Sequence, residues 1–449
     1  MTRLIVYLLF CLPLVPLSAQ EVPQMSLKEA VGYAYEHDKS IENARLNIED
    51  ADQQIVENRA IGLPKINASV DYQYFFQIPV SVLPEAFEEI VKAGNGGELP
   101  EGFSRQAEFA FRNNFNLGAE LNTMIFDGSY FIGLRAARLY REYVGQEMVA
   151  TQKDLQNRVV EAYLPPLILK ENLGILDKNI SNLEKLLNET RETYKAGFVE
   201  QLDVDRLELS LANLQVEKDN LERQKEVTIN VLKLTIGYPI DEPLEVSDEI
   251  DDLLEAATPD DLEGPINFYG RPEYKVAELG VTLNQLNIDR YRSGYLPDLR
   301  GFANWQYGYQ GNELFRGDGF WAPNTLAGIR LNIPIFDGFD RKAKVQRARV
   351  AMAISQNQKI DLERVITLEI QNARIDYRSA QERVASQKKN LELADRIYQT
   401  TQIKYREGVG SSLEVTQAEQ GLYQTQQNYT QALFELLVAK STLYRALGK

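Results

Sequence analysis

The sequence Ile125-Phe126-Asp127-Gly128 occurs a second time in this chain, as Ile335-Phe336-Asp337-Gly338. Each copy ends a stretch in which apolar and polar residues alternate, as in a β-strand, and each precedes a long charged stretch with helical periodicity. A Tyr-x-x-Gly turn follows each copy at nearly the same distance, because Asp127 precedes Gly197 by 70 residues and Asp337 precedes Gly408 by 71. Self-similarity at a fixed spacing predicts two tandem structural repeats.

The first 20 residues predict a secretory signal peptide. Arg3 precedes an apolar run over residues 4–17, and small residues of a cleavage site follow at Ser18-Ala19. The run is shorter than the roughly 20 residues of a membrane-spanning helix. The only cysteine, Cys11, lies in this run. A lipid-anchoring motif at Cys11 is an alternative interpretation, against which the bulky Phe10 argues.

The composition argues against a nucleic-acid-binding protein and against an enzyme. The formal net charge is −16, whereas proteins that bind nucleic acid present basic surfaces. After residue 20 no cysteine remains, and His37 is the only histidine in the chain. A zinc site built on cysteine or histidine and a histidine-based catalytic triad are therefore not expected. We predict no cofactor, no metal site and no catalytic residues.

Four stretches of alternating residues predict β-strands, at residues 66–74, 115–126, 299–307 and 325–335. Strands of about ten residues with one apolar and one polar face are typical of transmembrane β-barrels. Aromatic residues near the strand ends then predict girdles at the membrane interfaces: Tyr72, Tyr74, Trp305, Tyr307 and Trp321. The alternative is a soluble antiparallel sheet with one face in water.

A membrane-spanning part of this chain would have to be a closed barrel. No stretch after residue 20 contains 18 consecutive apolar residues, and only helices and closed barrels satisfy the backbone within lipid. Four strands cannot close a barrel or cover their own edges. The sequence therefore demands oligomerisation if these strands cross a membrane.

Helical patterns fill most of the remaining chain. Residues 26–60 predict one helix, which begins at a capping box formed by Ser26 and Glu29. The stretch from Gly128 to Gly197 predicts a helix of roughly 100 Å at 1.5 Å per residue, with leucines at coiled-coil spacing. Pro165-Pro166 within it predicts a local break.

The predicted organisation places a first repeat at residues 21–237, an acidic connector at 238–270 and a second repeat at 271–449. Each repeat is expected to contain a helix, two barrel strands and a long helical hairpin. The connector contains eleven acids and no lysine or arginine. We expect it to contain short helical pieces and a solvated face.

This ordered set of paired motifs resembles the TolC family of outer-membrane efflux proteins. The pairs are the Leu-Pro strand starts at Leu63 and Leu296, the two Phe-Asp-Gly junctions, the two Tyr-x-x-Gly turns, and the helix ends near Gly237 and Gly448. The resemblance implies a mixed α and β homotrimer. Four strands from each protomer would form a twelve-stranded barrel in outer-membrane lipid, continued by a long α-helical coiled-coil tunnel across the periplasm.

The same resemblance implies a passive exit duct of a tripartite efflux or type I secretion system. A periplasmic adaptor, or membrane fusion protein, and an inner-membrane pump would be its partners. The turns would form the periplasmic tip that docks the adaptor, with Tyr194, Gly197, Tyr405, Gly408 and Ser411 as its residues. Candidate gate acids follow the turns: Asp203, Asp205, Glu414 and Glu419. The alternative for each acid is a solvated helix face.

Two other functions are weighed against this hypothesis. A soluble periplasmic coiled-coil scaffold would be a monomer or dimer that needs no detergent. An enzyme with acidic catalysis would need a pocket of paired carboxylates, which the sequence does not single out. The cargo cannot be named from these residues.

Overall fold

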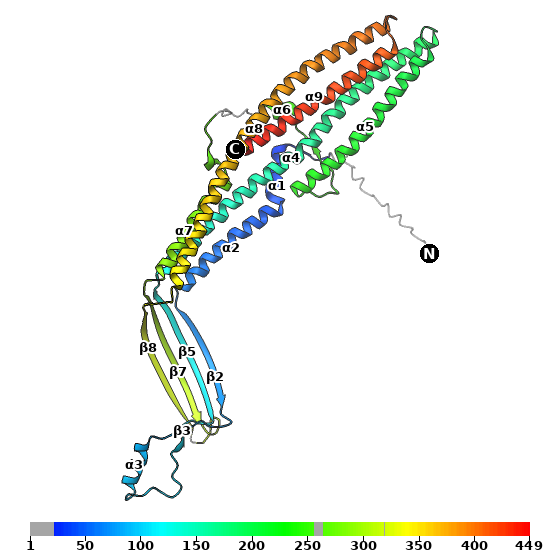
Figure 1. Ribbon diagram of the computed structural model, residues 1–449. Coiled ribbons are helices and arrows are strands. Elements are labelled where there is room, and N and C mark those ends of the chain that lie inside the picture. The colour runs from blue at the N-terminus through cyan, green and yellow to red at the C-terminus, as the bar shows by residue number, and fades with distance from the viewer. Residues whose placement is uncertain (1–21, 256–263, 318) are drawn as a thin grey trace, which may run out of the picture. The chain divides into compact units, whose positions relative to one another are not determined.

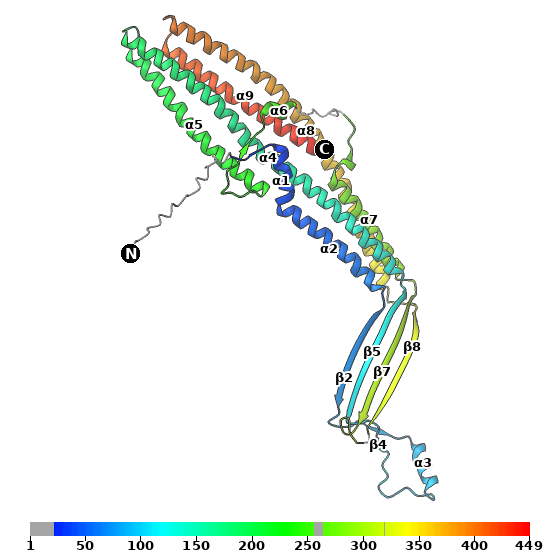
Figure 2. The same ribbon diagram turned by 180° about the vertical axis from the view of Figure 1, so that it is seen from behind.

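The structure, a computed structural model, describes residues 22–255, 264–317 and 319–449 (Figures 1 and 2). The predicted signal peptide at residues 1–20 lies outside the described residues. The elements follow one another in this order: β1 (Gln24–Met25), α1 (Leu27–His37), α2 (Lys39–Ile61), β2 (Lys65–Tyr74), β3 (Val80–Val82), α3 (Glu85–Gly94), β4 (Gln106–Glu108), β5 (Asn113–Phe126), α4 (Gly128–Lys195), α5 (Gln201–Ile236), β6 (Glu245–Val246), α6 (Ile250–Glu255), η1 (Phe268–Gly270), α7 (Pro272–Ser293), β7 (Asp298–Gly311), β8 (Phe320–Asn332), α8 (Asp340–Arg406) and α9 (Ser412–Ala446).

The chain divides into two compact units, which are described separately. The helical unit comprises the described residues of Met1–Ile48, Val144–Ala277 and Gln358–Lys449. The sheet unit comprises Glu49–Tyr143 and the described residues of Glu278–Asn357. Both units take residues from both halves of the sequence, so neither half forms a unit of its own.

The sheet unit is built on an antiparallel sheet with the strand order β2-β5-β7-β8 (Figure 1). All four predicted strands are confirmed, and the β5–β7 pairing joins the two halves of the sequence. The prediction for the last strand is wrong at its end, because β8 stops at Asn332 and does not reach Ile335. Pro334 has no N–H to donate to a neighbouring strand, which explains the early end.

The strand register sorts the side chains onto two faces of different chemistry. Directly paired residues of antiparallel strands point to the same face, so Val70, Leu117, Tyr307 and Pro323 form one row of an apolar face. The apolar face is strongly exposed: Ile66, for example, is 75% exposed. The residues between these rows form the polar face. Its rows consist mostly of Asn, Gln, Gly and charged residues.

The loop between β2 and β5 has structure of its own. It contains the short antiparallel pair β3–β4 and the helix α3, which follows Pro84. Phe87 and Ile90 of α3 are exposed. The β7–β8 connection is much shorter, since β7 ends at Gly311 and β8 begins at Phe320.

The helical unit is dominated by four long helices, α4, α5, α8 and α9, which lie side by side in both views (Figures 1 and 2). Their apolar faces form separate core clusters along the bundle. One cluster contains Leu183, Leu186 and Leu187 of α4 together with Val204 and Leu207 of α5. These residues therefore pack α4 against α5.

The predicted break at Pro165-Pro166 is wrong, because α4 is one helix of 68 residues from Gly128 to Lys195. Each proline removes one backbone hydrogen bond from the helix. The flanking Tyr163, Leu164 and Leu167 are almost completely buried in the main core cluster. Tertiary packing supplies most of the stability of a helix in a protein, and here it outweighs the lost bonds.

The prediction of one helix over residues 26–60 is wrong at a single residue. The capping box of Ser26 and Glu29 is confirmed at the start of α1, but the helix ends at Asp38, whose backbone is extended. The Asp38 carboxylate accepts hydrogen bonds from the backbone N–H, at 2.7 Å, and the hydroxyl of Ser40. Asp38 therefore ends α1 and caps α2. Its side chain competes with the backbone for local hydrogen bonds, which the apolar periodicity does not reveal.

The described residues of the acidic connector make hydrogen bonds to the helical unit. Its short helices α6 and η1 confirm the predicted helical pieces. It also holds a strand that the sequence did not reveal, because β6 pairs in parallel with β1. Lys170 of α4 donates hydrogen bonds to the carbonyls of Val246, Ser247 and Asp248 at 3.2–3.3 Å.

Candidate functional site

The two Tyr-x-x-Gly turns have the same backbone geometry. Gly197 and Gly408 have φ values of 82° and 73°, the left-handed region that favours glycine. The N–H of Gly197 donates to the carbonyl of Tyr194 at 2.8 Å, and that of Gly408 donates to Tyr405 at 3.0 Å. These bonds end α4 and α8, and the chain then turns into α5 and α9.

The helices after the turns begin with different caps. Ser411 caps α9, because its hydroxyl accepts a hydrogen bond from the N–H of Glu414 at 3.3 Å. The first turn has a reciprocal capping box made by Glu200 and Asp203, which the sequence analysis did not identify. Because its first residue is Glu200, this box does not fit the Ser/Thr-x-x-Glu/Gln pattern.

A polar cluster joins the starts of α5 and α9. Ser412, which is fully buried, donates a hydrogen bond to the carboxylate of Asp203 and accepts one from Arg206 at 3.2 Å. Ser412 lies 209 residues from Asp203 and 206 from Arg206, so only the fold brings it to them. No local sequence pattern marks this cluster, because it depends on the packing of α5 against α9.

The four candidate gate acids have four different surroundings. Asp203 is half-buried in the polar cluster just described. Asp205 is exposed and accepts a hydrogen bond from Gln201 at 2.7 Å, and Glu414 is exposed in the first turn of α9. Glu419 is only 6% exposed. The structure therefore does not present these acids as one charged ring within the protomer.

Glu419 is a buried acid without a basic partner among the described residues. Its Oε2 accepts a hydrogen bond from the Ser210 hydroxyl of α5 at 2.9 Å, and its buried Oε1 has no hydrogen-bond partner there. Burial raises the pKa of Glu419 to about 6, and the bond from Ser210 offsets part of that rise. Tyr398 of α8 faces the same site, and burial raises its pKa to about 12, with the Glu419 charge as a second cause.

The two long hairpins are linked near their turns by contacts between α4 and α8. The guanidinium of Arg406 lies 2.9 Å from the carboxylate of Glu189. The Tyr405 hydroxyl donates to Thr190 Oγ1 at 3.4 Å. Tyr405 is therefore held within the bundle, whereas its counterpart Tyr194 is exposed.

The two strand–helix junctions differ although their sequences are identical. Asp127 accepts hydrogen bonds from the N–H and hydroxyl of Ser129 at 2.8 and 2.6 Å, and α4 begins directly at Gly128. A Cβ at Gly128 would lie 3.0 Å from a methyl carbon of Leu296 and 3.3 Å from the Cβ of Ser293, so a larger residue there would require these neighbours to shift. At the second junction Gly338 has φ 65° and α8 begins two residues later.

The predicted aromatic girdle residues all lie on the apolar face of the sheet and are all exposed: Tyr72, Tyr74, Trp305, Tyr307 and Trp321. Tyr307 stacks on Trp321 with ring centroids 4.8 Å apart. Tyr72 and Trp321 belong to the same row, with Phe115 and Tyr309 between them. Most of these rings thus gather toward the end of the sheet at which β2 and β7 finish.

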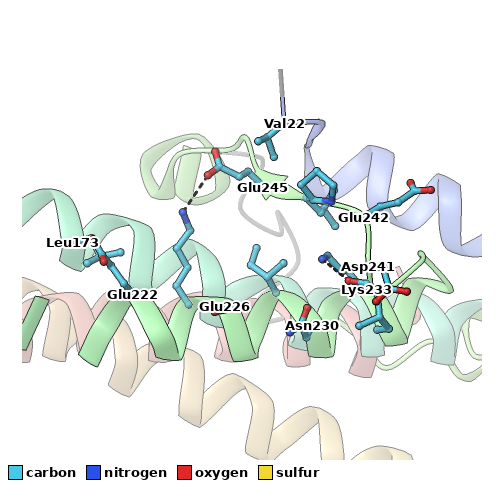
Figure 3. A pocket seen from close by; sticks show the side chains of 14 residues that line it. Val22, Leu173, Glu222, Glu226, Asn230, Lys233, Asp241, Glu242 and Glu245 are labelled. Atoms are coloured by element: carbon cyan, nitrogen blue, oxygen red, sulfur yellow. Dashed lines mark hydrogen bonds and ion pairs between the residues drawn. The ribbon is translucent and has the colours of Figure 1, made fainter. Parts of the chain in front are cut away.

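A cavity of about 780 Å³ lies between α5 and the connector (Figure 3). Lys225 pairs with Glu245 at 3.5 Å, and the Lys233 ammonium donates to the Ile240 carbonyl at 3.0 Å. Further carboxylates line it, from Glu222, Glu226, Asp241 and Glu242. Both lysines belong to α5 and hold the connector against it. Their contacts at this cavity are therefore structural.

No helix in the described part of the chain is long and apolar enough to cross a membrane.

Comparison with known proteins finds similarity to outer membrane efflux proteins. Residues 270–449 match the family model described as outer membrane efflux protein. The resemblance to the TolC family is confirmed. The chain is 22% identical to the toluene efflux pump outer membrane protein TtgC of Pseudomonas putida over 402 residues, which is 88% of this chain and 81% of that protein. It is 27% identical to the pyoverdine export outer membrane protein OpmQ of Pseudomonas aeruginosa over 301 residues, covering 66% of this chain and 61% of that protein.

Solved structures of this family share the fold. CusC, whose structure is described in terms of transmembrane channel formation, superposes with a TM-score of 0.72 at 17% identity, covering 95% of this chain and 92% of that one. The open-state MtrE outer membrane channel of Neisseria gonorrhoeae superposes with a TM-score of 0.69 at 18% identity, covering 94% and 88%. The mixed helix-and-strand architecture is therefore the fold that these channel structures share.

Proposed function

We propose that this protein is a trimeric channel-tunnel of the outer membrane and the exit duct of a tripartite efflux or type I secretion system. Three copies would complete a twelve-stranded barrel from four strands each, and the long helices would continue it as a coiled-coil tunnel in the periplasm. The two halves of the chain would act as tandem repeats around the acidic connector. The duct itself would be passive and not an enzyme, with an inner-membrane pump as the source of energy.

The four-stranded sheet is the observation that carries this proposal. Its outer strands β2 and β8 each have one edge without a strand partner in the described chain, and open edges of this length need cover. Its apolar face is exposed and carries the aromatic residues, whereas the opposite face is polar. Pairing β2 of one copy with β8 of the next would close the edges, turn the apolar face to lipid and leave the polar face around a pore.

The turns at Gly197 and Gly408 are the proposed docking site for the periplasmic adaptor. Tyr194, exposed Phe198 and Val409 offer apolar contacts beside the two glycines. The acids Asp203, Asp205, Glu414 and Glu419 are the proposed gate region, with Asp203 acting through its bond to Ser412. Relatives named for toluene efflux and pyoverdine export support small organic molecules as cargo.

Native mass determination of the purified protein tests the proposal. We expect extraction from membranes to require detergent and the detergent-solubilised protein to have the mass of three chains. A monomer or dimer that is extracted without detergent would contradict it and would favour the soluble scaffold.

A further inference from the structure

All basic residues of the four-stranded sheet lie at one end of its polar face. They are Lys65 of β2, Arg300 of β7 and Arg330 of β8. Arg300 and Arg330 are directly paired across the two strands. Lys65 belongs to the next row, through its pairing with Asn122 and the pairing of Asn122 with Phe302. This is the end at which β2 and β7 begin.

Two arginines directly opposite each other repel, so the pair costs the sheet stability. Each guanidinium is held by a different neighbour. Arg300 Nε donates to Asp298 at 3.2 Å, and Asp298 also accepts a hydrogen bond from Asn332 at 2.8 Å. This bond fixes the Arg300 guanidinium beside its partner strand.

Arg330 is held by an aromatic ring. Its guanidinium carbon lies 5.3 Å from the ring centre of Phe302, an arrangement that attracts a cation. Gly328 makes this possible, because a Cβ there would lie 2.8 Å from the Phe302 ring. The Phe302 ring thus packs over Gly328 and holds the Arg330 guanidinium on the polar face.

The held guanidiniums keep donors available. An arginine has five N–H donors in a planar fork, and Arg300 uses only Nε toward Asp298. Within the described part of the chain, the Arg330 guanidinium makes no hydrogen bond. Asp298 lies at this end of the polar face, and Asp127, just after β5, attracts Arg300. Glu120 lies in the row beyond Lys65. The three basic residues still outnumber the two acids at this end.

We propose that Lys65, Arg300 and Arg330 form a basic belt that binds carboxylate or phosphate groups of solutes passing through the duct. The inference rests on the proposed function, in which the polar face lines the pore and three copies bring their belts together. Arginine forks bind these planar or tetrahedral anions by paired hydrogen bonds. A ring of one charge sign also raises the local concentration of counter-ions. The belt would favour anionic cargo in a protein whose overall charge is −16.

The test is a recording of the full-length protein in planar bilayers of phosphatidylcholine, with inorganic phosphate as the probe. Arg330→Gln should weaken the block of current by phosphate by roughly tenfold, the effect of losing one charged hydrogen-bonding group. Arg316→Gln, which removes the same charge from the β7–β8 loop, should leave the block unchanged. Arg330→Lys should weaken the block less than Arg330→Gln, because it keeps the charge and loses the fork. If Arg330→Gln does not assemble, the phosphate block of Arg330→Lys is compared with that of wild type instead.

Equal phosphate block in wild type, Arg330→Gln and Arg330→Lys would overturn the inference. So would a phosphate effect that appears only after anionic phosphatidylglycerol is added, since the belt would then bind lipid phosphate. A wild-type protein that forms no conducting trimers would overturn the proposed function first, and the inference with it. A conducting wild type with unaltered block in the variants overturns the belt alone.

Discussion

Glu208 of α5 and Glu419 of α9 each lie eleven residues after the glycine of their hairpin turn. Glu208 is exposed and forms an ion pair with Arg191 at 2.6 Å. Glu419 is buried, accepts one hydrogen bond from Ser210 and has no ion pair within the described residues. The position that corresponds to Arg191 in the second hairpin holds Gln402. The two acids at the same place in the hairpin therefore differ both in charge pairing and in burial.

The turns themselves show a similar contrast. Gly197 is followed two residues later by Val199, and Gly408 by Gly410. A Cβ at Gly410 would lie 3.1 Å from the backbone nitrogen of Tyr405 and 3.2 Å from the Cβ of Lys404. The chain returns closer to α8 in the second turn and has less room to adjust.

The largest effect is expected from valine at the turn glycines. Gly197→Val and Gly408→Val both force a β-branched residue to positive φ, which costs about 2 kcal/mol. Gly408→Val should cost more than Gly197→Val, because the tight approach of Gly410 prevents relaxation. Hydrogen exchange of the backbone amides in the first turns of α5 and α9 measures each local stability. Equal acceleration in the two variants would show that Gly410 does not constrain the turn.

Glu419→Gln tests the buried acid. The pKa of Glu419 in the folded protein, about 6, lies above its ordinary value of 4.5, so the folded state binds the proton more tightly than the unfolded state does. Stability is then highest below pH 4.5, falls as the pH rises through 6 and is lower by about 2 kcal/mol at pH 7.5. Glutamine is neutral at every pH, and the variant should lose this dependence and gain stability above pH 6.

The matched variant for that experiment is Glu208→Gln. It removes an acid at the corresponding position but breaks an ion pair, so no gain in stability above pH 6 is expected. Chemical denaturation at pH 4.5 and pH 7.5 measures both variants. A Glu419→Gln protein that is less stable than wild type at pH 7.5 would mean that the charged form is the favoured one.

The sequence was sufficient for much of this fold because its signals are local. The period-two stretches located β2, β5, β7 and β8, and the glycines located both turns. Which face of the sheet carries which residues also followed from alternation. The errors arose where one residue competes with a pattern, as Asp38 does by its side-chain bond and Pro334 by its missing N–H.

The candidate site was less predictable, because its environment depends on contacts between distant residues. Glu419 is predicted only as a candidate gate acid. No periodicity reveals that it is buried and bonded to Ser210, 209 residues away. The Arg300–Arg330 pair could not be predicted either, because it depends on the register of β7 against β8. The prolines of α4 show the converse case, in which distant packing overrides a strong local signal.

The smallest effect is expected from Arg191→Gln, which gives the first hairpin the residue found at the corresponding place in the second. Both side chains of the Arg191–Glu208 pair are 46% exposed, so solvent screens their attraction. We expect a loss of at most about 0.5 kcal/mol at low salt and less at 1 M salt, where the Debye length falls to roughly 3 Å. A double-mutant cycle with Glu208→Gln isolates the pair energy. A coupling well above 1 kcal/mol that persists in high salt would show that the pair is shielded from solvent, and the contrast between Glu208 and Glu419 would then be one of charge pairing and not of burial.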